Sequence, residues 1–176
     1  GVTNLTGDSN GFVGAINVTG GRLMVNGTFG QGQVTVSNAA TLGGTGVIGS
    51  LSAQSGATIA PGNSIGTLRV AGNASFAAGS TYQVELNSAG QSDLINIVGT
   101  ANVANGALLT VTKTDSSPYV FGKHYIVLSA AGGLTGKFTF TTVQLSNFIG
   151  LVGSSAANRY YIDLTTIKTF GSAGAA

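Results

Sequence analysis

Cysteine is absent and charge is scarce in this chain of 176 residues. The lack of cysteine excludes disulfides and thiolate metal sites, so the fold must rely on backbone pairing and burial. Charged residues make up 7% of the chain, against about 25% in ordinary globular proteins. The seven basic residues are scattered, whereas a phosphate backbone is bound by a basic cluster. We therefore expect no nucleic-acid partner.

Long apolar runs are also missing. No charge-free apolar segment reaches the roughly 18 residues that a membrane-spanning helix needs. Residues 1–5 lack the basic and apolar regions of a signal peptide. The apolar content of 43% nevertheless excludes a disordered tail. Glycine (29 residues) dominates, with Ala, Ser, Thr, Asn and Val, which indicates an all-β chain with many turns.

An irregular repeat runs through the first two thirds of the chain. A small residue precedes each apolar, alternating run at Gly21, Ala40, Gly56, Gly79 and Gly106, at intervals of 19, 16, 23 and 27 residues. Such periods are typical of solenoids, in which each turn of chain buries its inward side chains against its neighbours. Small residues at Ala39, Ala40 and Ala53 would let neighbouring turns approach. The predicted inward residues are Val18, Leu23, Val25, Val34, Val36, Leu42, Ile59, Leu68 and Val70.

The composition changes near residue 75. Two aromatic residues precede that point, and eleven lie from Phe76 onward. Period-two alternation predicts strands over residues 82–86 and 160–164, and we also expect strands over 125–130 and 137–143. Residues 113–123 are polar, contain Pro118 and interrupt the repeat. A solenoid needs a cap because its last turn exposes an unpaired strand edge; the predicted cap-core residues are Tyr82, Val84, Leu86, Tyr125, Phe138 and Phe140.

Several short motifs also follow one another in a characteristic order. They are GGTGVIG at 43–49, TIAPGNSIGTL at 58–68, YQVEL at 82–86, SDLINI at 92–97 and AGGLTGKF at 131–138. This order resembles the C-terminal part of the passenger of bacterial autotransporters, and the resemblance covers roughly residues 14–164. It implies a right-handed parallel β-helix over residues 1–112, a C-terminal β cap over 113–166 and a flexible linker over 167–176. The family's autochaperone segment would correspond to about 67–166.

The resemblance also implies a function. The chain would be a non-catalytic stem that seeds folding and secretion of the β-helix by type V secretion. Its partners would be its own translocator barrel and upstream passenger turns, both absent from this sequence, which would then be a piece of a larger protein. It would lie at the bacterial cell surface, attached to the outer membrane before any cleavage. The alternative is an adhesin that binds a host cell or matrix through one face.

The residues that could carry chemistry favour neither an enzyme nor a cofactor site. Gly44–Gly49 matches the dinucleotide pattern GxGxxG, but no helical periodicity follows it, so we interpret these glycines as turn residues. His124 could form a triad with a serine and Asp115 or Asp163, but no nucleophile elbow is present, and we expect a histidine at a strand start packed near Tyr125. Asp93 is expected to cap a turn.

No catalytic, cofactor-binding or metal-binding residue is therefore predicted. The five carboxylates are dispersed, which also argues against a calcium site or the acid cluster of a polysaccharide lyase. One group of aromatic residues could form a ligand platform, but its alternation with polar residues favours the core of the cap. That group comprises Tyr119, Phe121, Tyr125, Phe138, Phe140, Phe148, Tyr160 and Tyr161.

Overall fold

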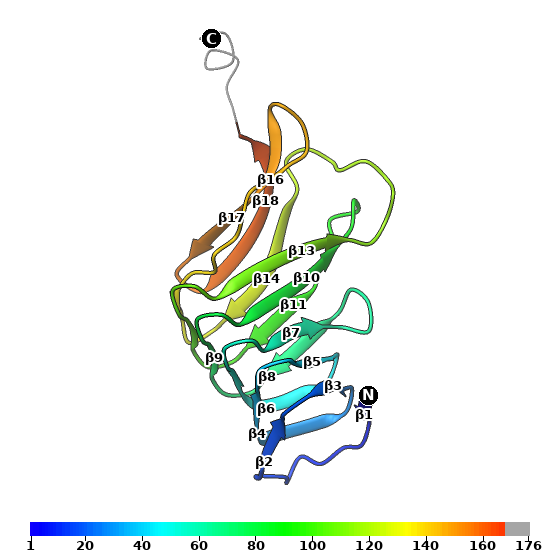
Figure 1. Ribbon diagram of the computed structural model, residues 1–176, viewed down its shortest axis with the longest axis vertical. Coiled ribbons are helices and arrows are strands. Elements are labelled where there is room, and N and C mark those ends of the chain that lie inside the picture. Colours follow the sequence, from blue (N-terminus) through cyan, green and yellow to red (C-terminus); the bar gives the residue numbers. More distant parts are fainter. Residues whose placement is uncertain (168–176) are drawn as a thin grey trace.

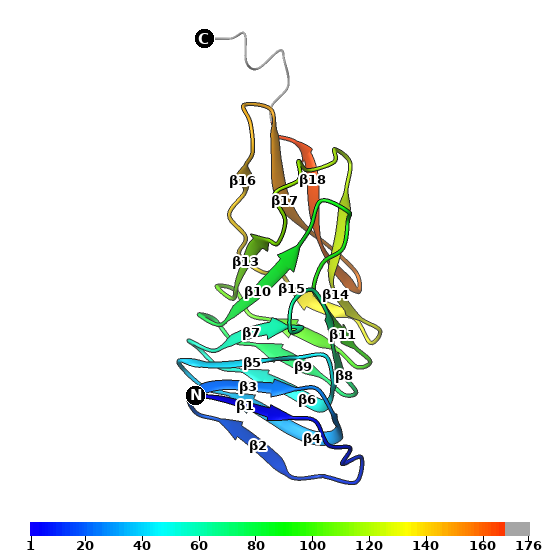
Figure 2. The ribbon, with the colours of Figure 1, turned by 90° about the vertical axis from the view of Figure 1, so that its right-hand side faces the viewer.

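The computed structural model describes residues 1–167, and every regular element in that range is a β-strand. The chain alternates between two sheets along an elongated molecule (Figures 1 and 2). All strand pairs in sheet A are parallel. The strands of sheet A, in spatial order, are β1 (Val2–Leu5), β3 (Gly21–Val25), β5 (Ala40–Gly44), β7 (Thr58–Pro61), β10 (Thr81–Leu86) and β13 (Leu108–Lys113). The all-β prediction is confirmed.

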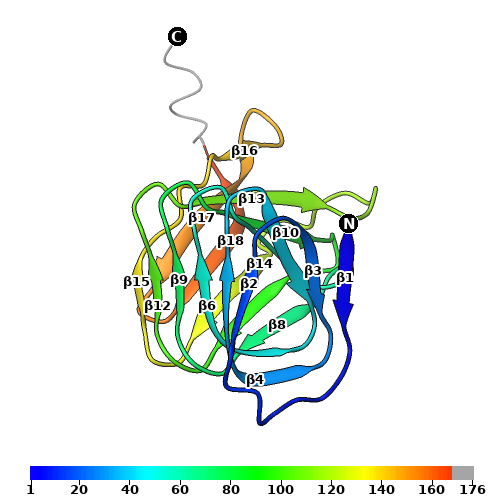
Figure 3. The ribbon, with the colours of Figure 1, turned by 60° about the horizontal axis from the view of Figure 1, so that its bottom comes forward.

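Sheet B is curled, because long strands pair with different neighbours along their length. β6, for example, pairs with β8 at Val47 and with β9 at Leu51. The parallel strands of sheet B are β2 (Ala15–Val18), β4 (Thr28–Val36), β6 (Val47–Ala53), β8 (Thr67–Val70), β9 (Ala74–Phe76), β11 (Leu94–Ile97), β12 (Ala101–Val103), β14 (His124–Ala130) and β15 (Leu134–Gly136). Antiparallel pairing adds β18 (Arg159–Thr166), β17 (Ile149–Ala156) and β16 (Val143–Gln144) beyond β14. Figure 3 shows sheet B curving round from β4 to β15.

The register of sheet A reproduces the repeat found in the sequence. Gly21 pairs with Ala40, Thr58 with Thr81, and Thr81 with Leu108, which gives offsets of 19, 23 and 27 residues. The offset between β5 and β7 is 17 residues rather than the 16 predicted. The longer offsets arise from insertions between a strand of sheet A and the next strand of sheet B. These insertions are residues 62–66, 87–93 and 114–123.

The core lies between the two sheets and contains all nine predicted inward residues, from Val18 to Val70. Ala40 and Ala53 are buried as well, while Ala39 is exposed and adopts a left-handed backbone conformation (φ 62°). The two predicted alternating strands are confirmed: Tyr82 and Ile162 point inward with their i±2 neighbours. The period of two therefore determines which side chains fill the interior.

The prediction of a strand over residues 137–143 is wrong. Within that segment Thr139 forms an isolated bridge with Leu108, and Val143 starts β16. Phe138 enters the core instead, with 3% of its surface exposed. β17, which the sequence analysis missed, supplies the antiparallel strand at this end. Its polar half (Ser154 and Ser155) and its glycines hide the period of two.

Candidate functional site

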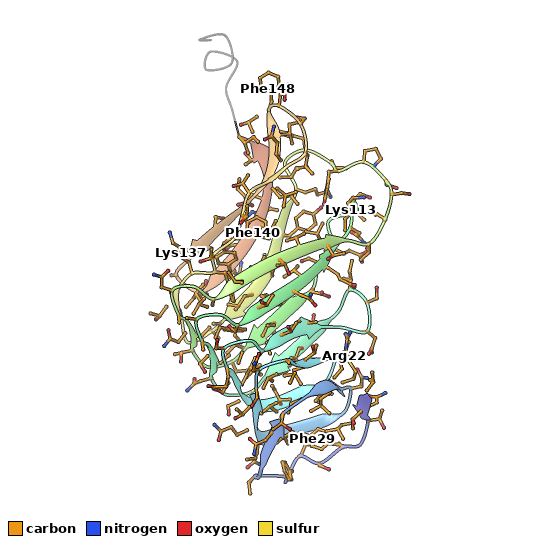
Figure 4. The ribbon with its side chains drawn as sticks, viewed as in Figure 1. Arg22, Phe29, Lys113, Lys137, Phe140 and Phe148 are labelled. Carbon is orange, nitrogen blue, oxygen red and sulfur yellow. The ribbon has the colours of Figure 1, made fainter. Side chains whose placement is uncertain are left out.

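The candidate site is the C-terminal end of the molecule, where parallel and antiparallel pairing meet. β14 pairs in parallel with β11 and antiparallel with β18. Five of the six predicted cap-core residues are buried, which confirms them; the sixth, Phe140, is half-buried and packs against the edge of the core. Figure 4 shows Phe140 above the first half of β13.

Four aromatic rings form a continuous cluster through this end. Phe138 lies 5.1 Å from Phe76, 5.6 Å from Tyr82 and 5.4 Å from Tyr160, measured between ring centroids. Two of these contacts are edge-on, a geometry that adds roughly 0.5–1.5 kcal/mol per pair beyond area burial. The cluster joins side chains from sheet A, the antiparallel strands and residue 138.

The buried tyrosines also tie separate elements together by hydrogen bonds. Tyr82 Oη donates to the carbonyl of Val127 at 2.6 Å, and Tyr125 Oη donates to the carbonyl of Asn87 at 2.7 Å. Burial raises the pKa of Tyr82 well above its usual value, so the neutral hydroxyl stays a donor at physiological pH. These bonds link β10 with β14, and β14 with the 87–93 insertion.

The other aromatic residues of the predicted group divide between core and surface. Tyr125 and Tyr160 are buried, whereas Phe121 is 59% exposed and is not part of the cap core. Tyr119, Tyr161 and Phe148 are half-buried. The core interpretation of this group is therefore right for part of it and wrong for Phe121.

Asp93 has the turn-capping role that the sequence predicts. It is 1% exposed, and its two carboxylate oxygens accept hydrogen bonds from the backbone amides of Gly66 (2.9 Å) and Glu85 (2.7 Å). Burial raises the pKa of Asp93 to about 6, although the two amide donors act in the opposite direction. One carboxylate thus connects the 62–66 insertion with β10.

Asp115 ties the two longest insertions to each other. Its carboxylate contacts Lys113 and accepts hydrogen bonds from the amide (3.0 Å) and the hydroxyl (2.8 Å) of Ser88. Hydrogen bonds from Lys113 and Ser88 lower the pKa of Asp115 to about 2. Lys113 Nζ also lies 5.1 Å from the ring centroid of Tyr119, a distance suited to a cation–π contact.

His124 begins β14, as predicted, but it packs against Tyr161 (4.1 Å between centroids) and not near Tyr125. Neighbouring residues of a strand point to opposite faces, and Tyr125 points inward. His124 Nδ1 contacts Asp163, while Ser154 Oγ donates to the other carboxylate oxygen at 2.8 Å. In a catalytic triad the serine hydroxyl would contact the imidazole, so this contact order does not make a triad.

The GxGxxG glycines are turn and packing residues, as predicted. Gly44 has a left-handed backbone (φ 103°), and a Cβ there would lie 2.1 Å from the carbonyl oxygen of Val25 in the preceding turn. β6 starts at Val47, so a strand rather than a helix follows. Among residues 1–167 no group of three or more His, Asp or Glu could hold a metal ion. The same residues include no helix that is long and apolar enough to cross a membrane.

Asparagine side chains form hydrogen-bonded ladders across successive turns, a feature whose positions the sequence could not assign. Asn26 Nδ2 donates to Asn4 Oδ1 at 2.8 Å, and Asn63 Nδ2 donates to Asn26 Oδ1 at 3.0 Å. Asn73 Oδ1 likewise accepts a bond from the amide of Thr100. These contacts hold turn against turn at the corners.

Comparison with known proteins finds no protein family that matches the chain and no matching sequence among curated proteins. What the site offers is therefore defined by its geometry: a buried aromatic cluster, tied insertions and an antiparallel layer that closes sheet B.

Proposed function

We propose that the chain is a right-handed parallel β-helix with a C-terminal cap, and that it acts as a non-catalytic stem and folding seed. The observation that carries this proposal is the pairing order of sheet A, in which each strand pairs only with the strand of the preceding and following turn. In such a stack stability is a sum of nearest-neighbour terms, so folding can start in one place and propagate.

The two ends of the stack differ, which gives the proposed seed a direction. At the C-terminal end β18, β17 and β16 cover the last strand of sheet B, and the aromatic cluster is buried beneath them. At the other end β1 is an edge strand and Val2 is 70% exposed. Unpaired strand edges accept further strands, so further turns would add at β1.

The biological setting is the passenger of a bacterial autotransporter. The motif order at 43–138 and the asymmetric stack both support it. The stem would lie at the bacterial surface by type V secretion, attached to the outer membrane before any cleavage. Its partners would be upstream passenger turns and its own translocator barrel. The fold gives this role its mechanism, because a capped end that folds first would template turns added at the open end.

The proposal is tested by limited proteolysis of the intact chain during a urea titration, with mass analysis of the surviving pieces. We expect a resistant C-terminal fragment that begins between residues 67 and 80, because that fragment would contain the aromatic cluster and the antiparallel strands. Loss of the whole chain in a single step, with no surviving C-terminal piece, would contradict the seed.

A second candidate function is an adhesin that binds a host surface through one face of sheet B. One observation favours it: a row of short, uncharged polar residues runs straight across six parallel strands, in register. The row comprises Asn17, Thr35, Ser52, Ser75, Asn102 and Thr135. Loss of cell or matrix binding in a Thr35→Lys/Ser75→Lys variant that unfolds like the parent would favour this function over a stem alone.

A further inference from the structure

β13 is the last strand of sheet A, and most of its outer edge is free. On the inner side it pairs with β10 along its whole length, from Thr81↔Leu108 to Leu86↔Lys113. On the outer side it forms a single bridge, Leu108↔Thr139. The chain then continues to β16, which pairs with β17 and not with β13. The antiparallel strands therefore close sheet B and leave sheet A open.

The hydrogen bonds around β13 show which backbone groups are free. The amide of Leu108 donates to Ser80 O (2.8 Å) and that of Thr114 to Leu86 O (2.9 Å), so the even-numbered amides face β10. The amide of Leu109 donates outward to Thr139 O (3.0 Å). By the alternation of a strand the amide of Val111 also faces outward. No strand within residues 1–167 pairs with it.

Apolar surface lies at both ends of this free edge. A groove of about 360 Å³ along the first half is lined by Leu109, Val111 and Phe140, among others. A second groove of about 360 Å³ lies beyond the end of the strand and is lined by Tyr119, Phe121, Leu145, Ser146, Ile149 and Leu164. Tyr119 is in contact with Lys113, the last residue of β13. Figure 4 shows Phe140 and Lys113 toward opposite ends of the strand.

The exposed apolar residues are concentrated in the same place. Nine large apolar side chains are exposed within the described chain, and five of them belong to β13 or to residues 120–121 and 143–145. Those five are Leu108, Val120, Phe121, Val143 and Leu145. Natural sheet edges are normally protected by lysine, proline or a bulge, but residues 108–112 carry no charge or proline. Lys113 is already engaged with Asp115.

We propose that the outer edge of β13 is a docking site for an extended strand of another polypeptide, apolar at alternate positions, that lengthens sheet A in the parallel sense. The inner edge defines the chemistry of this partner, because β10 places Tyr82 beside Leu109 and Val84 beside Val111. Backbone bonds to the free groups would give affinity, and the two grooves would select apolar side chains.

The shape of the molecule favours a single strand over a second whole copy. β16, β17 and β18 rise beyond β13 along the long axis (Figures 1 and 2). The end of another complete molecule would meet these strands before it reached β13, whereas a single extended segment can lie beside them.

The test uses the full chain and a synthetic peptide of residues 79–88, which carries the strand that β13 already pairs with. We expect saturable binding by fluorescence anisotropy, and slower hydrogen exchange of the Val111 amide in the bound state. A control peptide with Tyr82→Ser and Val84→Ser should bind at least tenfold more weakly. Absence of binding to the folded chain, or equal binding of the control peptide, would overturn the proposal.

Two variants locate the site. Val111→Pro removes an outward amide without touching a bond to β10, and an edge strand tolerates proline at such a position. Leu108→Lys places a charge at the first groove and keeps the backbone intact should the proline variant fold poorly. Each should weaken peptide binding at least tenfold, while Val98→Lys, an exposed position in a turn, should change it less than twofold. Unchanged binding to a folded Leu108→Lys variant would overturn the site.

Self-association is the remaining outcome. Concentration-dependent dimers that disappear in the Val111→Pro variant and compete with the peptide would show that a second copy occupies the edge, which would overturn the proposed foreign strand. A monomer across the concentration range of the peptide titration is the expected result, measured by light scattering after size-exclusion chromatography.

Discussion

Asp93 and Ser80 are the buried polar residues of the described chain, and they use their buried groups in turns. Ser80 Oγ donates to the carbonyl of Ala77 at 2.7 Å. Asp93 holds two segments through backbone amides of Gly66 and Glu85. A buried carboxylate is costly to ionise unless it is well bonded, so its protonation is linked to the stability of the fold.

The stability of the protein should therefore fall as pH rises from about 4 to about 6. Asp93 has a pKa of about 6 in the folded chain against 3.8 without the fold. The folded state consequently holds its proton over a range where the unfolded state has lost it, which favours folding at the lower pH. The linkage reaches at most about 3 kcal/mol. Urea unfolding at intervals between pH 4 and 7 measures it.

The Asp93→Asn variant is the control for that pH profile. Asparagine does not titrate, so the decrease attributed to Asp93 should disappear even if the variant is less stable at every pH. A profile that keeps the same slope between pH 4 and 6 in the variant would assign the pH dependence to other groups.

Phe138→Ala should lower the free energy of unfolding by about 3–5 kcal/mol, because it empties the centre of the aromatic cluster. The matched control is Phe121→Ala, since Phe121 is 59% exposed and its removal should change stability by less than about 0.5 kcal/mol. Both values come from urea titrations at fixed pH. Equal effects of the two substitutions would show that the cluster does not carry the stability of this end.

Glycine positions separate backbone strain from steric conflict. Gly44 and Gly122 both have positive φ, but a Cβ at Gly44 would lie 2.1 Å from the Val25 carbonyl oxygen, whereas one at Gly122 meets nothing within 4 Å. Gly122→Ala should therefore cost about 1–2 kcal/mol from the left-handed backbone alone. Gly44→Ala should cost clearly more in thermal or urea unfolding. Similar costs would mean that neighbouring turns separate easily.

At the scale of the elements, the alternation of apolar residues was sufficient to predict the interior of the strands. Val18, Val34 and Ile59 could be placed inward because a strand buries every second residue. The repeat intervals predicted the offsets between turns because each insertion lies between strands and leaves their register unchanged.

The antiparallel strands could be predicted only in part. Residues 160–164 alternate clearly, but β17 contains Gly150 and Gly153 and ends in small polar residues, so its pattern is weak. Gly153 is required there because a Cβ would lie 2.4 Å from Tyr160 Oη. Residues 137–143 alternate in the sequence but do not pair, because Phe138 is drawn into the aromatic cluster.

Contacts between distant residues were beyond the sequence. The pairing of His124 with Asp163 was one of two options, and only the register of β14 with β18 selects it. The link from Asp115 to Ser88 and the Asn4–Asn26–Asn63 ladder depend on which turns lie side by side. The predicted linker over residues 167–176 lies, beyond its first residue, outside the described part of the chain.

The insertions should tolerate added length. Eight Gly/Ser residues placed after Ser117, in the exposed 114–123 insertion, should lower stability by less than about 1 kcal/mol, because loop entropy grows slowly with length. The same segment placed after Thr45, in the two-residue turn between β5 and β6, should be much more costly, since Gly44 and Gly46 pack closely on the preceding turn. Thermal unfolding of both variants decides between a tolerant insertion and a rigid one.

For the molecule as a whole, the stacking predicts a gradient of local stability. Internal strands have neighbours on both sides, whereas β1 has one. Hydrogen exchange followed by mass spectrometry should show the slowest amides in β10, β11 and β14, around the aromatic cluster, and the fastest in β1 and β2. Uniform exchange across all turns would show that the chain opens as one cooperative unit, without a separate C-terminal seed.

The orientation of the strands also has a mechanical consequence. The first residue and the end of β18 lie at opposite ends of the long axis, and the strands cross that axis one above another (Figures 1 and 2). Hydrogen bonds between parallel neighbours therefore point largely along the direction in which the two ends would be pulled. A force applied there would peel the molecule open one turn at a time, at low load and over a long extension. It would act as a compliant tether that yields gradually rather than as a rigid rod that breaks.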